Sequence, residues 1–183
     1  MYKNHIKALF IVIPLLSIGL YFLFEKTKNT VDSSVQRSFE LGNSFPDFEG
    51  TDIQGRPFKS SNFKDQVVII NFWASWCAPC IEEIPSLIKL VNELDGKVQL
   101  IAISSDYSLE EIETFKKSFP GLNHKNITIY WDNDRSYMKR FNIFKLPESY
   151  ILRKNSVIAK KISGTIDWHT ENSIQYFKDL FNE

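Results

Sequence analysis

The sequence predicts a mixed α/β layer structure, and three features of the chain support this prediction. Two continuous apolar runs, at 67–72 and 98–104, are typical of strands that are buried on both faces of a sheet. A helical pattern follows each run. Two short apolar runs near the end, at 149–152 and 157–162, resemble an antiparallel pair that turns at Lys154-Asn155. Strand, helix, strand, helix and a late hairpin together describe a sheet with helices packed on it.

An uncharged apolar run occupies residues 8–24, and Lys3 and Lys7 precede it. Its length is at the short end of what spans a bilayer and exceeds most signal-peptide cores. Because no small-residue cleavage pattern follows, we expect an uncleaved transmembrane signal anchor with residues 1–7 in the cytoplasm. Export followed by signal cleavage and release is the alternative.

Residues 25–40 are polar and rich in Ser, Thr, Asn and Lys, which predicts a linker. A globular pattern begins at position 41 and continues to 183. In its first part, Phe45–Phe48 and the Pro57-Phe58 pair lie on either side of a turn at Gln54-Gly55. This spacing predicts short strands around that turn, a β-hairpin that forms an N-terminal extension of the fold.

The remaining elements follow from apolar periodicity and from helix start and stop signals. They are a helix from the cysteines to Leu94, a helix over 109–119, a strand over 127–131, a short helix over 133–141 and a closing amphipathic helix over 168–181. Ser108 and Glu111 have the spacing of a capping box at the start of the second helix.

Composition excludes several classes of function. Lys plus Arg and Asp plus Glu both number 22, so there is no basic excess for binding nucleic acid. Two cysteines are too few for a multi-bridge scaffold, and the three histidines lack metal-ligand spacing, so we expect no metal. Covalent haem attachment needs a histidine at the position of Ile81. Redox chemistry at a cysteine pair is the remaining interpretation, with no cofactor besides a redox-active disulfide.

Cys77 and Cys80 lie where a predicted strand ends and a helix begins. A helix N-terminus favours thiolate over thiol and lowers the cysteine pKa from about 8.5 toward 7 in such motifs. Pro79 restricts the loop between them and cannot donate a competing N–H. A purely structural disulfide is the alternative, but a bridge that closes so short a loop contributes little stability.

The segment from Asn71 to Cys80, Asn-Phe-Trp-Ala-Ser-Trp-Cys-Ala-Pro-Cys, is followed by Glu83 and resembles the extracytoplasmic thioredoxin-like proteins of the TlpA, ResA and CcmG group. These are membrane-tethered reductases, several of which serve cytochrome c maturation. The resemblance extends over about 45–162 and includes Leu-Pro-Glu-Ser-Tyr-Ile at 146–151. It implies a thioredoxin-like fold, with a central mixed sheet flanked by helices.

The resemblance also implies roles for individual residues. Cys77 becomes the nucleophile and Cys80 the resolving cysteine. Pro147 becomes a cis proline that faces the cysteines, where it exposes the backbone of Leu146 to a substrate strand. An ordinary strand-entry proline is the alternative at that position. Trp76 and Trp73 are expected to pack around the cysteines and to shape a docking surface.

Two glutamates are candidates beyond the cysteine pair. Glu83, on the helix face turned toward the cysteines, resembles the active-site glutamate of the ResA-like branch and is expected to carry protons with a raised pKa. A solvated helix carboxylate is the alternative. Glu148 matches a Pro-Glu pair of the CcmG-like branch and is either a contact to the partner protein or a plain surface residue. Asn71 stands where cytoplasmic thioredoxins carry a buried aspartate, and it cannot titrate.

The leading functional hypothesis is a protein disulfide reductase in the bacterial cytoplasmic membrane, with its catalytic domain on the periplasmic or extracytoplasmic side. Its partners would be exported proteins with disulfides, such as apocytochrome c, and a membrane thiol electron donor. Two alternatives stay open: a disulfide oxidase or isomerase, and a thioredoxin-fold binding module that does not need its cysteines. Peroxide reduction has less support, because the Thr and Arg that accompany a lone peroxidatic cysteine are missing.

Overall fold

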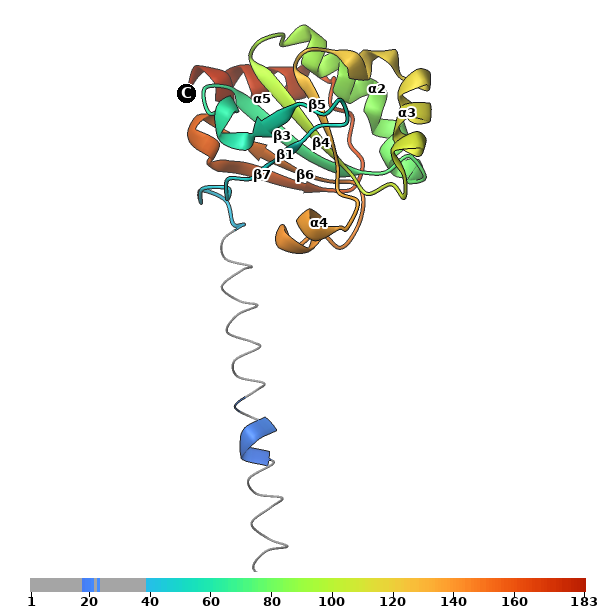
Figure 1. Ribbon diagram of the computed structural model, residues 1–183. Helices are drawn as coiled ribbons and strands as arrows, with labels where there is room; N and C mark the ends of the chain where they lie inside the picture. Colours follow the sequence, from blue (N-terminus) through green and yellow to red (C-terminus); the bar gives the residue numbers. More distant parts are fainter. Residues whose placement is uncertain (1–17, 22, 24–38) are drawn as a thin grey trace, which may run out of the picture. The chain divides into compact units, whose positions relative to one another are not determined.

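The computed structural model describes residues 18–21, 23 and 39–183 (Figure 1). Most of the predicted anchor at 8–24 and of the predicted linker at 25–40 lies outside the described residues. Within the described part of the chain, no helix combines the length and the apolar character needed to cross a membrane. The description below concerns the domain from Phe39 onward.

A five-stranded sheet forms the centre of this domain, with the strand order β5-β4-β3-β6-β7. Its strands are β3 (Val67–Trp73), β4 (Val98–Ser104), β5 (Ile127–Trp131), β6 (Glu148–Leu152) and β7 (Ile158–Ser163). β3, β4 and β5 run parallel, whereas β6 and β7 are antiparallel to their neighbours. Every residue of β3 and β4 is buried, as their continuous apolar runs predict.

The helices follow the predicted order. They are α2 (Ala78–Glu93), α3 (Leu109–Ser118), α4 (Ser136–Arg140) and α5 (Glu171–Asn182), with short 3-10 segments η1 (Ser60–Phe63), η2 (Pro120–Asn123) and η3 (Lys154–Ser156). The predicted capping box is confirmed: Ser108 Oγ accepts from the Glu111 N–H at 3.2 Å, and Glu111 Oε2 accepts from the Ser108 N–H at 3.3 Å. This reciprocal pair satisfies two N–H groups that have no partner within α3.

Helix α4 is shorter than its predicted range of 133–141. Arg135, directly before it, has a φ of 57°, in the left-handed region, so the helix cannot extend back through this residue. The carboxylate of Asp132 instead reaches across to accept N–H groups of Tyr137 and Met138 at 3.1 and 2.9 Å. A carboxylate several residues upstream therefore caps α4.

The predicted N-terminal hairpin is present as β1 (Glu49–Thr51) and β2 (Pro57–Lys59), paired antiparallel in a two-stranded sheet of their own. Its first strand begins after the predicted Phe45–Phe48. Gly55 in the connecting turn has a φ of +80°, which glycine adopts without strain. Asp52 Oδ1 accepts from the backbone N–H of Gln54 and of Arg56, at 2.9 Å each. The turn is thus held by its own aspartate.

Helices α2, α3 and α5 lie along one side of the sheet, and α4 lies on the opposite side (Figure 1). The cluster beneath the three long helices joins residues such as Ile69 of β3, Leu87 of α2 and Phe177 of α5, and it includes both cysteines. The cysteine pair is therefore part of the main hydrophobic core.

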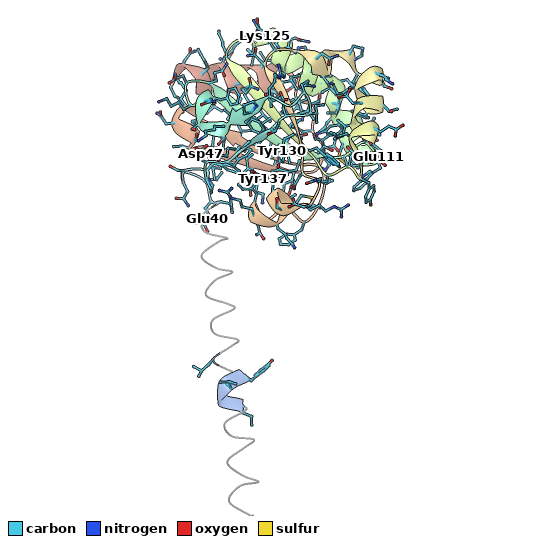
Figure 2. The ribbon with its side chains drawn as sticks, viewed as in Figure 1. Glu40, Asp47, Glu111, Lys125, Tyr130 and Tyr137 are labelled. Carbon is cyan, nitrogen blue, oxygen red and sulfur yellow. A yellow bond between two sulfur atoms is a disulfide. The ribbon has the colours of Figure 1, made fainter. Side chains whose placement is uncertain are left out.

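Aromatic side chains from the N-terminal segment and α4 cover the other face of the sheet. Tyr130 and Tyr137, both labelled in Figure 2, meet edge to face with ring centroids 4.9 Å apart. Phe39 falls in the predicted linker, yet its ring packs against Phe45 and Phe141 at 5.7 and 5.8 Å. The packed domain consequently begins before position 41, because the Phe39 side chain, within the polar segment, packs into the aromatic cluster on this face of the sheet.

Candidate active site

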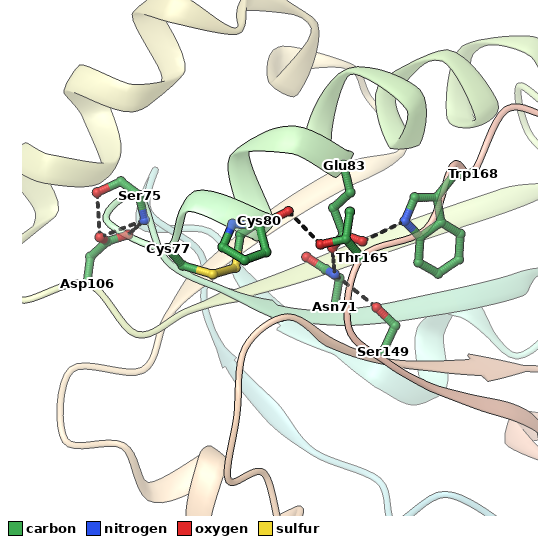
Figure 3. Close-up of a disulfide and its surroundings, with 10 residues drawn as sticks. Asn71, Ser75, Cys77, Cys80, Glu83, Asp106, Ser149, Thr165 and Trp168 are labelled. Carbon is green, nitrogen blue, oxygen red and sulfur yellow. Dashed lines mark hydrogen bonds between the residues drawn. A yellow bond between two sulfur atoms is a disulfide. The ribbon is translucent and has the colours of Figure 1, made fainter.

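A disulfide joins Cys77 and Cys80 at the point where β3 leads into α2 (Figure 3). Cys77 is the N-cap residue of α2, with extended backbone angles, and its carbonyl accepts from the N–H of Cys80 at 3.0 Å and of Ile81 at 3.1 Å. Pro79 lies in the first turn, where its missing N–H has no helical partner to lose. The positive end of the helix dipole thus faces Cys77.

The two sulfur-bearing residues differ in exposure. Cys77 is 7 % exposed and Cys80 is fully buried. An incoming thiolate or disulfide can reach the first residue more readily than the second. This asymmetry agrees with the predicted division into an attacking and a resolving cysteine.

Glu83, one turn after Cys80 on α2, has a side chain buried in the domain at 1 % exposure. Its Oε1 accepts a hydrogen bond from Asn71 Nδ2 at 2.8 Å, and its Oε2 accepts one from Trp168 Nε1 at 3.0 Å. Burial raises the pKa of the Glu83 carboxyl above its ordinary value, and the hydrogen bonds from Trp168 and Asn71 offset part of that effect. The solvated-carboxylate alternative is therefore wrong.

Asn71 connects the carboxylate to the neighbouring strand. Its Nδ2 also donates to Ser149 Oγ at 2.9 Å, and Asn71 and Ser149 are direct cross-strand partners on β3 and β6. Among the described residues, the amide oxygen of Asn71 has no hydrogen-bond partner although it is buried. The side-chain NH2 group of Asn71 therefore donates to two partners, whereas its side-chain oxygen accepts from none of the described residues.

The predicted cis bond before Pro147 is confirmed. Pro147 directly precedes β6, and its carbonyl accepts the N–H of Gly164 at 2.9 Å. Leu146 is partly buried and packs against both hydrophobic clusters.

The structure corrects the surface placement expected for Glu148. Its side chain is buried, at 4 % exposure, and forms an ion pair with Lys161 of β7. Phe72 of β3 lies directly opposite Glu148 in the sheet. All five residues of β6 are buried, so Glu148 is enclosed with its neighbours in a strand between β3 and β7, a placement that its sequence neighbours did not reveal.

The two tryptophans before the disulfide have different environments. Trp73 is fully buried and packs on Phe115 of α3 at 4.9 Å between ring centroids. Trp76 is 51 % exposed and stacks on Tyr107, with ring centroids 6.0 Å apart and planes 27° apart. Arg135 lies over the other ring of this pair, 5.3 Å from the Tyr107 centroid. Of these two tryptophans, Trp76 is the exposed one, at the position directly before Cys77.

Three residues around the site were not predicted from the sequence. Asp106 accepts hydrogen bonds from Ser75, Thr165 Oγ1 donates to the carbonyl of Pro79 at 2.9 Å, and Trp168 donates to Glu83. Asp106 follows the carboxyl end of buried strand β4, a position that could have drawn attention to it. Thr165 and Trp168 carry no comparable local signal, since their partners lie more than eighty positions earlier.

Comparison with known proteins gives relatives along most of the domain. The chain is 27 % identical over 132 residues to the thiol-disulfide oxidoreductase ResA of Bacillus cereus, covering 72 % of this chain and 74 % of that protein. It is 26 % identical over 146 residues to ResA of Bacillus subtilis, covering 79 % of this chain and 78 % of that protein.

Solved structures have the same fold at lower identity. StoA of Bacillus subtilis superposes with a TM-score of 0.59 at 24 % identity, covering 75 % of this chain and 97 % of its own. A thiol:disulfide interchange protein of Chlorobium tepidum has a TM-score of 0.65 at 20 % identity, covering 78 % of this chain and 98 % of its own.

The fold is thioredoxin-like. Together with the cysteine pair bridged at the start of α2 and the ResA relatives, it defines a thiol–disulfide oxidoreductase. Residues 41–168 match the AhpC/TSA family, and the chain belongs to that family. The resemblance to the TlpA, ResA and CcmG group drawn from the motif is thereby confirmed.

Proposed function

We propose that this protein reduces disulfides in exported proteins, with Cys77 as the attacking thiolate and Cys80 as the resolving thiol. The observation that carries this proposal is the disulfide at the N-terminus of α2, with the more exposed cysteine first and a buried carboxylate one turn further on. The names of the ResA relatives support the reaction type. No cofactor besides this disulfide takes part.

Two successive thiol–disulfide exchanges transfer two electrons from the reduced cysteine pair to the substrate disulfide. In the dithiol form, the Cys77 thiolate attacks a substrate disulfide, forms a mixed disulfide and releases one substrate thiolate. The Cys80 thiol then loses its proton and attacks Cys77 Sγ, which releases the second substrate thiolate and forms the bridge seen here. A membrane thiol donor, a dithiol by chemical class, returns two electrons to this bridge.

Glu83 is the proton carrier in the second step. It lies three residues after Cys80, and its carboxylate is the buried titratable group of this part of α2. As a carboxylate it can accept the Cys80 proton before attack, and its raised pKa makes that transfer more favourable than for a solvated glutamate.

The substrate chain binds beside Pro147 in this proposal. The backbone of Leu146 pairs with an extended substrate segment, and Trp76, half exposed next to Cys77, contacts the residues around the substrate cysteine. Exposed Pro79 borders the same surface. Glu148 has no place in this contact, because its carboxylate is buried against Lys161.

The location and the substrate class rest on the sequence. The apolar run at 8–24 supports a single-pass anchor in the bacterial cytoplasmic membrane, with the redox domain on the extracytoplasmic side. The motif resemblance supports apocytochrome c, whose haem-binding cysteines must be reduced before haem attachment, as a substrate.

The test uses the full chain and two single variants. The reduced Cys80→Ser variant should accumulate a mixed disulfide at Cys77 with a disulfide-bonded Cys-x-x-Cys-His peptide, detected by mass spectrometry, and Cys77→Ser should accumulate none. Trapping at Cys80 instead would contradict the assigned roles. Full complementation of a deletion strain by a variant without both cysteines would point to a binding module.

Direction and location need separate measurements. A dithiol titration should give a reduction potential clearly below the glutathione pool, about −220 to −260 mV, and a potential above it favours the oxidase or isomerase. A membrane-impermeant thiol reagent should label the reduced domain in intact cells from which any outer membrane barrier has been removed. Labelling only after lysis contradicts the extracytoplasmic location.

A further inference from the structure

Trp168 holds the carboxylate of Glu83 from a part of the chain that lies 85 positions away in the sequence. The indole is fully buried in the segment between β7 and α5, and its Nε1–H donates to Glu83 Oε2 at 3.0 Å (Figure 3). Asn71 Nδ2 donates to the other carboxylate oxygen at 2.8 Å. Each oxygen of the proton carrier is thus fixed by a different element of the fold.

The segment that carries the indole is fastened to α2 by further hydrogen bonds. The backbone N–H of Trp168 donates to Ser86 Oγ at 3.1 Å, and the Ser86 hydroxyl donates to the carbonyl of Glu83 at 2.8 Å. Thr165 Oγ1 donates to the carbonyl of Pro79 at 2.9 Å. The indole also packs against Phe177 of α5, with ring centroids 6.3 Å apart. Hydrogen bonds to α2 and packing against α5 therefore fix the position of the indole relative to Glu83.

The hydrogen-bond donors that reach Glu83 carry no charge. Burial raises the pKa of this carboxyl, and the bonds from Trp168, Asn71 and the backbone of Ile166 lower it, in that order of size. A donor to the ionised form stabilises it relative to the protonated form. The indole N–H, which donates directly to Glu83 Oε2, therefore favours the carboxylate form.

Other ionisable groups on the elements around Glu83 are engaged elsewhere or face solvent. Glu148 on β6 is paired with Lys161 of β7. Glu82 on α2 and Asp167 beside the indole are exposed. Cys80 is held in the disulfide and does not titrate in this form.

We propose that Trp168 is a positioning residue of the redox centre: its indole N–H orients the Glu83 carboxylate and favours its ionised form, which sets the pH range in which Glu83 accepts a proton. This inference rests on the proposed function, in which Glu83 serves Cys80. It goes further by assigning control of that group to a residue of the C-terminal segment, outside the loop and helix that carry the cysteines.

The direct test is a titration of Glu83 in the oxidised protein, where the cysteines contribute no proton. Carbon-13 NMR of labelled glutamate carboxyls follows each group, and the Glu83→Gln variant identifies the resonance. Trp168→Phe keeps a buried ring and removes the N–H donor. The pH midpoint of the Glu83 titration should therefore rise by about one pH unit, the order expected when a hydrogen bond to a charged group is lost.

A matched control exists on the same domain. Trp131 Nε1 donates to the carbonyl of Asp106 at 2.9 Å, so Trp131→Phe also deletes one indole donor but leaves Glu83 untouched. This control should leave the Glu83 midpoint unchanged. An unchanged midpoint in folded Trp168→Phe, or an equal shift in Trp131→Phe, overturns the proposal.

A second replacement covers the case in which Trp168→Phe does not fold. Incorporation of 3-benzothienylalanine at position 168 keeps the bicyclic shape and places sulfur where the N–H was. It should give the same upward shift, and absence of a shift again overturns the proposal.

Activity then separates this inference from the proposed function. In Trp168→Phe, the pH profile of disulfide reduction should shift to higher pH by as much as the pH midpoint of the Glu83 titration does. If Glu83→Gln leaves the rate and its pH profile unchanged, the proton-carrier role in the proposed function fails. The titration of Glu83 reports on Trp168 in either case.

Discussion

The carboxylate of Asp106 accepts hydrogen bonds from both the backbone N–H and the hydroxyl of Ser75, at 2.9 and 2.6 Å, two residues before Cys77. Its second oxygen accepts from Ser104 Oγ at 2.6 Å. The loop that leads into the disulfide is therefore held by a residue that directly follows the carboxyl end of the neighbouring strand β4.

Asp106→Ala should destabilise the domain by about 1–3 kcal/mol, because it leaves the buried Ser104 hydroxyl and the partly buried donors of Ser75 without this partner. Disulfide reduction should slow as the loop before Cys77 loses its anchor. Urea unfolding and a peptide-reduction assay measure the two effects. Asp65→Ala, at an exposed position, is the control and should change neither. Equal losses in both variants would contradict the assigned anchoring role.

Glu83→Gln should change how stability depends on pH. The pKa of Glu83 in the folded protein is above its ordinary value of 4.5, so between these two values the folded state binds more protons than the unfolded state. The contribution of this carboxyl to stability is present below 4.5 and is lost as pH rises through the folded pKa.

The free energy of unfolding of Glu83→Gln, relative to wild type, should therefore increase as pH rises from 4 to 8. Denaturant titrations of the oxidised proteins at a series of pH values measure this difference. Glu82→Gln changes the adjacent, exposed glutamate and is the matched control. A difference that stays flat with pH in Glu83→Gln contradicts the raised pKa.

Trp76→Ala should weaken the reaction with protein substrates and spare the fold. The side chain is 51 % exposed, so its loss should alter stability by no more than about 0.5 kcal/mol. Loss of an aromatic contact should lower kcat/KM for a disulfide-bonded protein about tenfold. A small disulfide without a peptide chain should be reduced at nearly the wild-type rate. Leu41→Ala, also exposed, is the control, and an equal loss on both substrates would argue against a docking role.

Lys161→Met should destabilise the domain by about 3 kcal/mol, because it leaves the buried Glu148 carboxylate without its ion partner. Lys160→Met changes the preceding lysine of β7, which faces the other side of the sheet, and should cost clearly less. Thermal and urea unfolding provide the comparison. Similar losses for both lysines would mean that the pairing with Glu148 contributes little.

Much of the fold could be predicted because its signals are local. The runs at 67–72 and 98–104 are continuous and apolar, and they became central strands. The Ser108 capping box was readable from two residues. The short helix α4 was predicted too long, because a left-handed residue at Arg135 and a distant cap at Asp132 depend on the folded loop.

The candidate site divides in the same way. Cys77, Cys80 and Glu83 share one stretch of strand and helix, so their spacing alone placed them together. The sequence spacing could not indicate Trp168, because it follows β7 and lies 85 positions after Glu83, and only the fold brings its indole to the carboxylate. The burial of Glu148 likewise follows from the place of β6 between β3 and β7 in the folded sheet.

The sequence by itself determined the chemistry: a cysteine pair at the start of a helix, with a glutamate one turn beyond, in a mixed α/β domain. The tertiary structure alone decided how that chemistry is tuned. Burial desolvates Glu83, and donors from β3 and the C-terminal segment converge on its two oxygens. Proton affinity depends on the groups within a few ångströms in space, and only the folded chain brings those groups together.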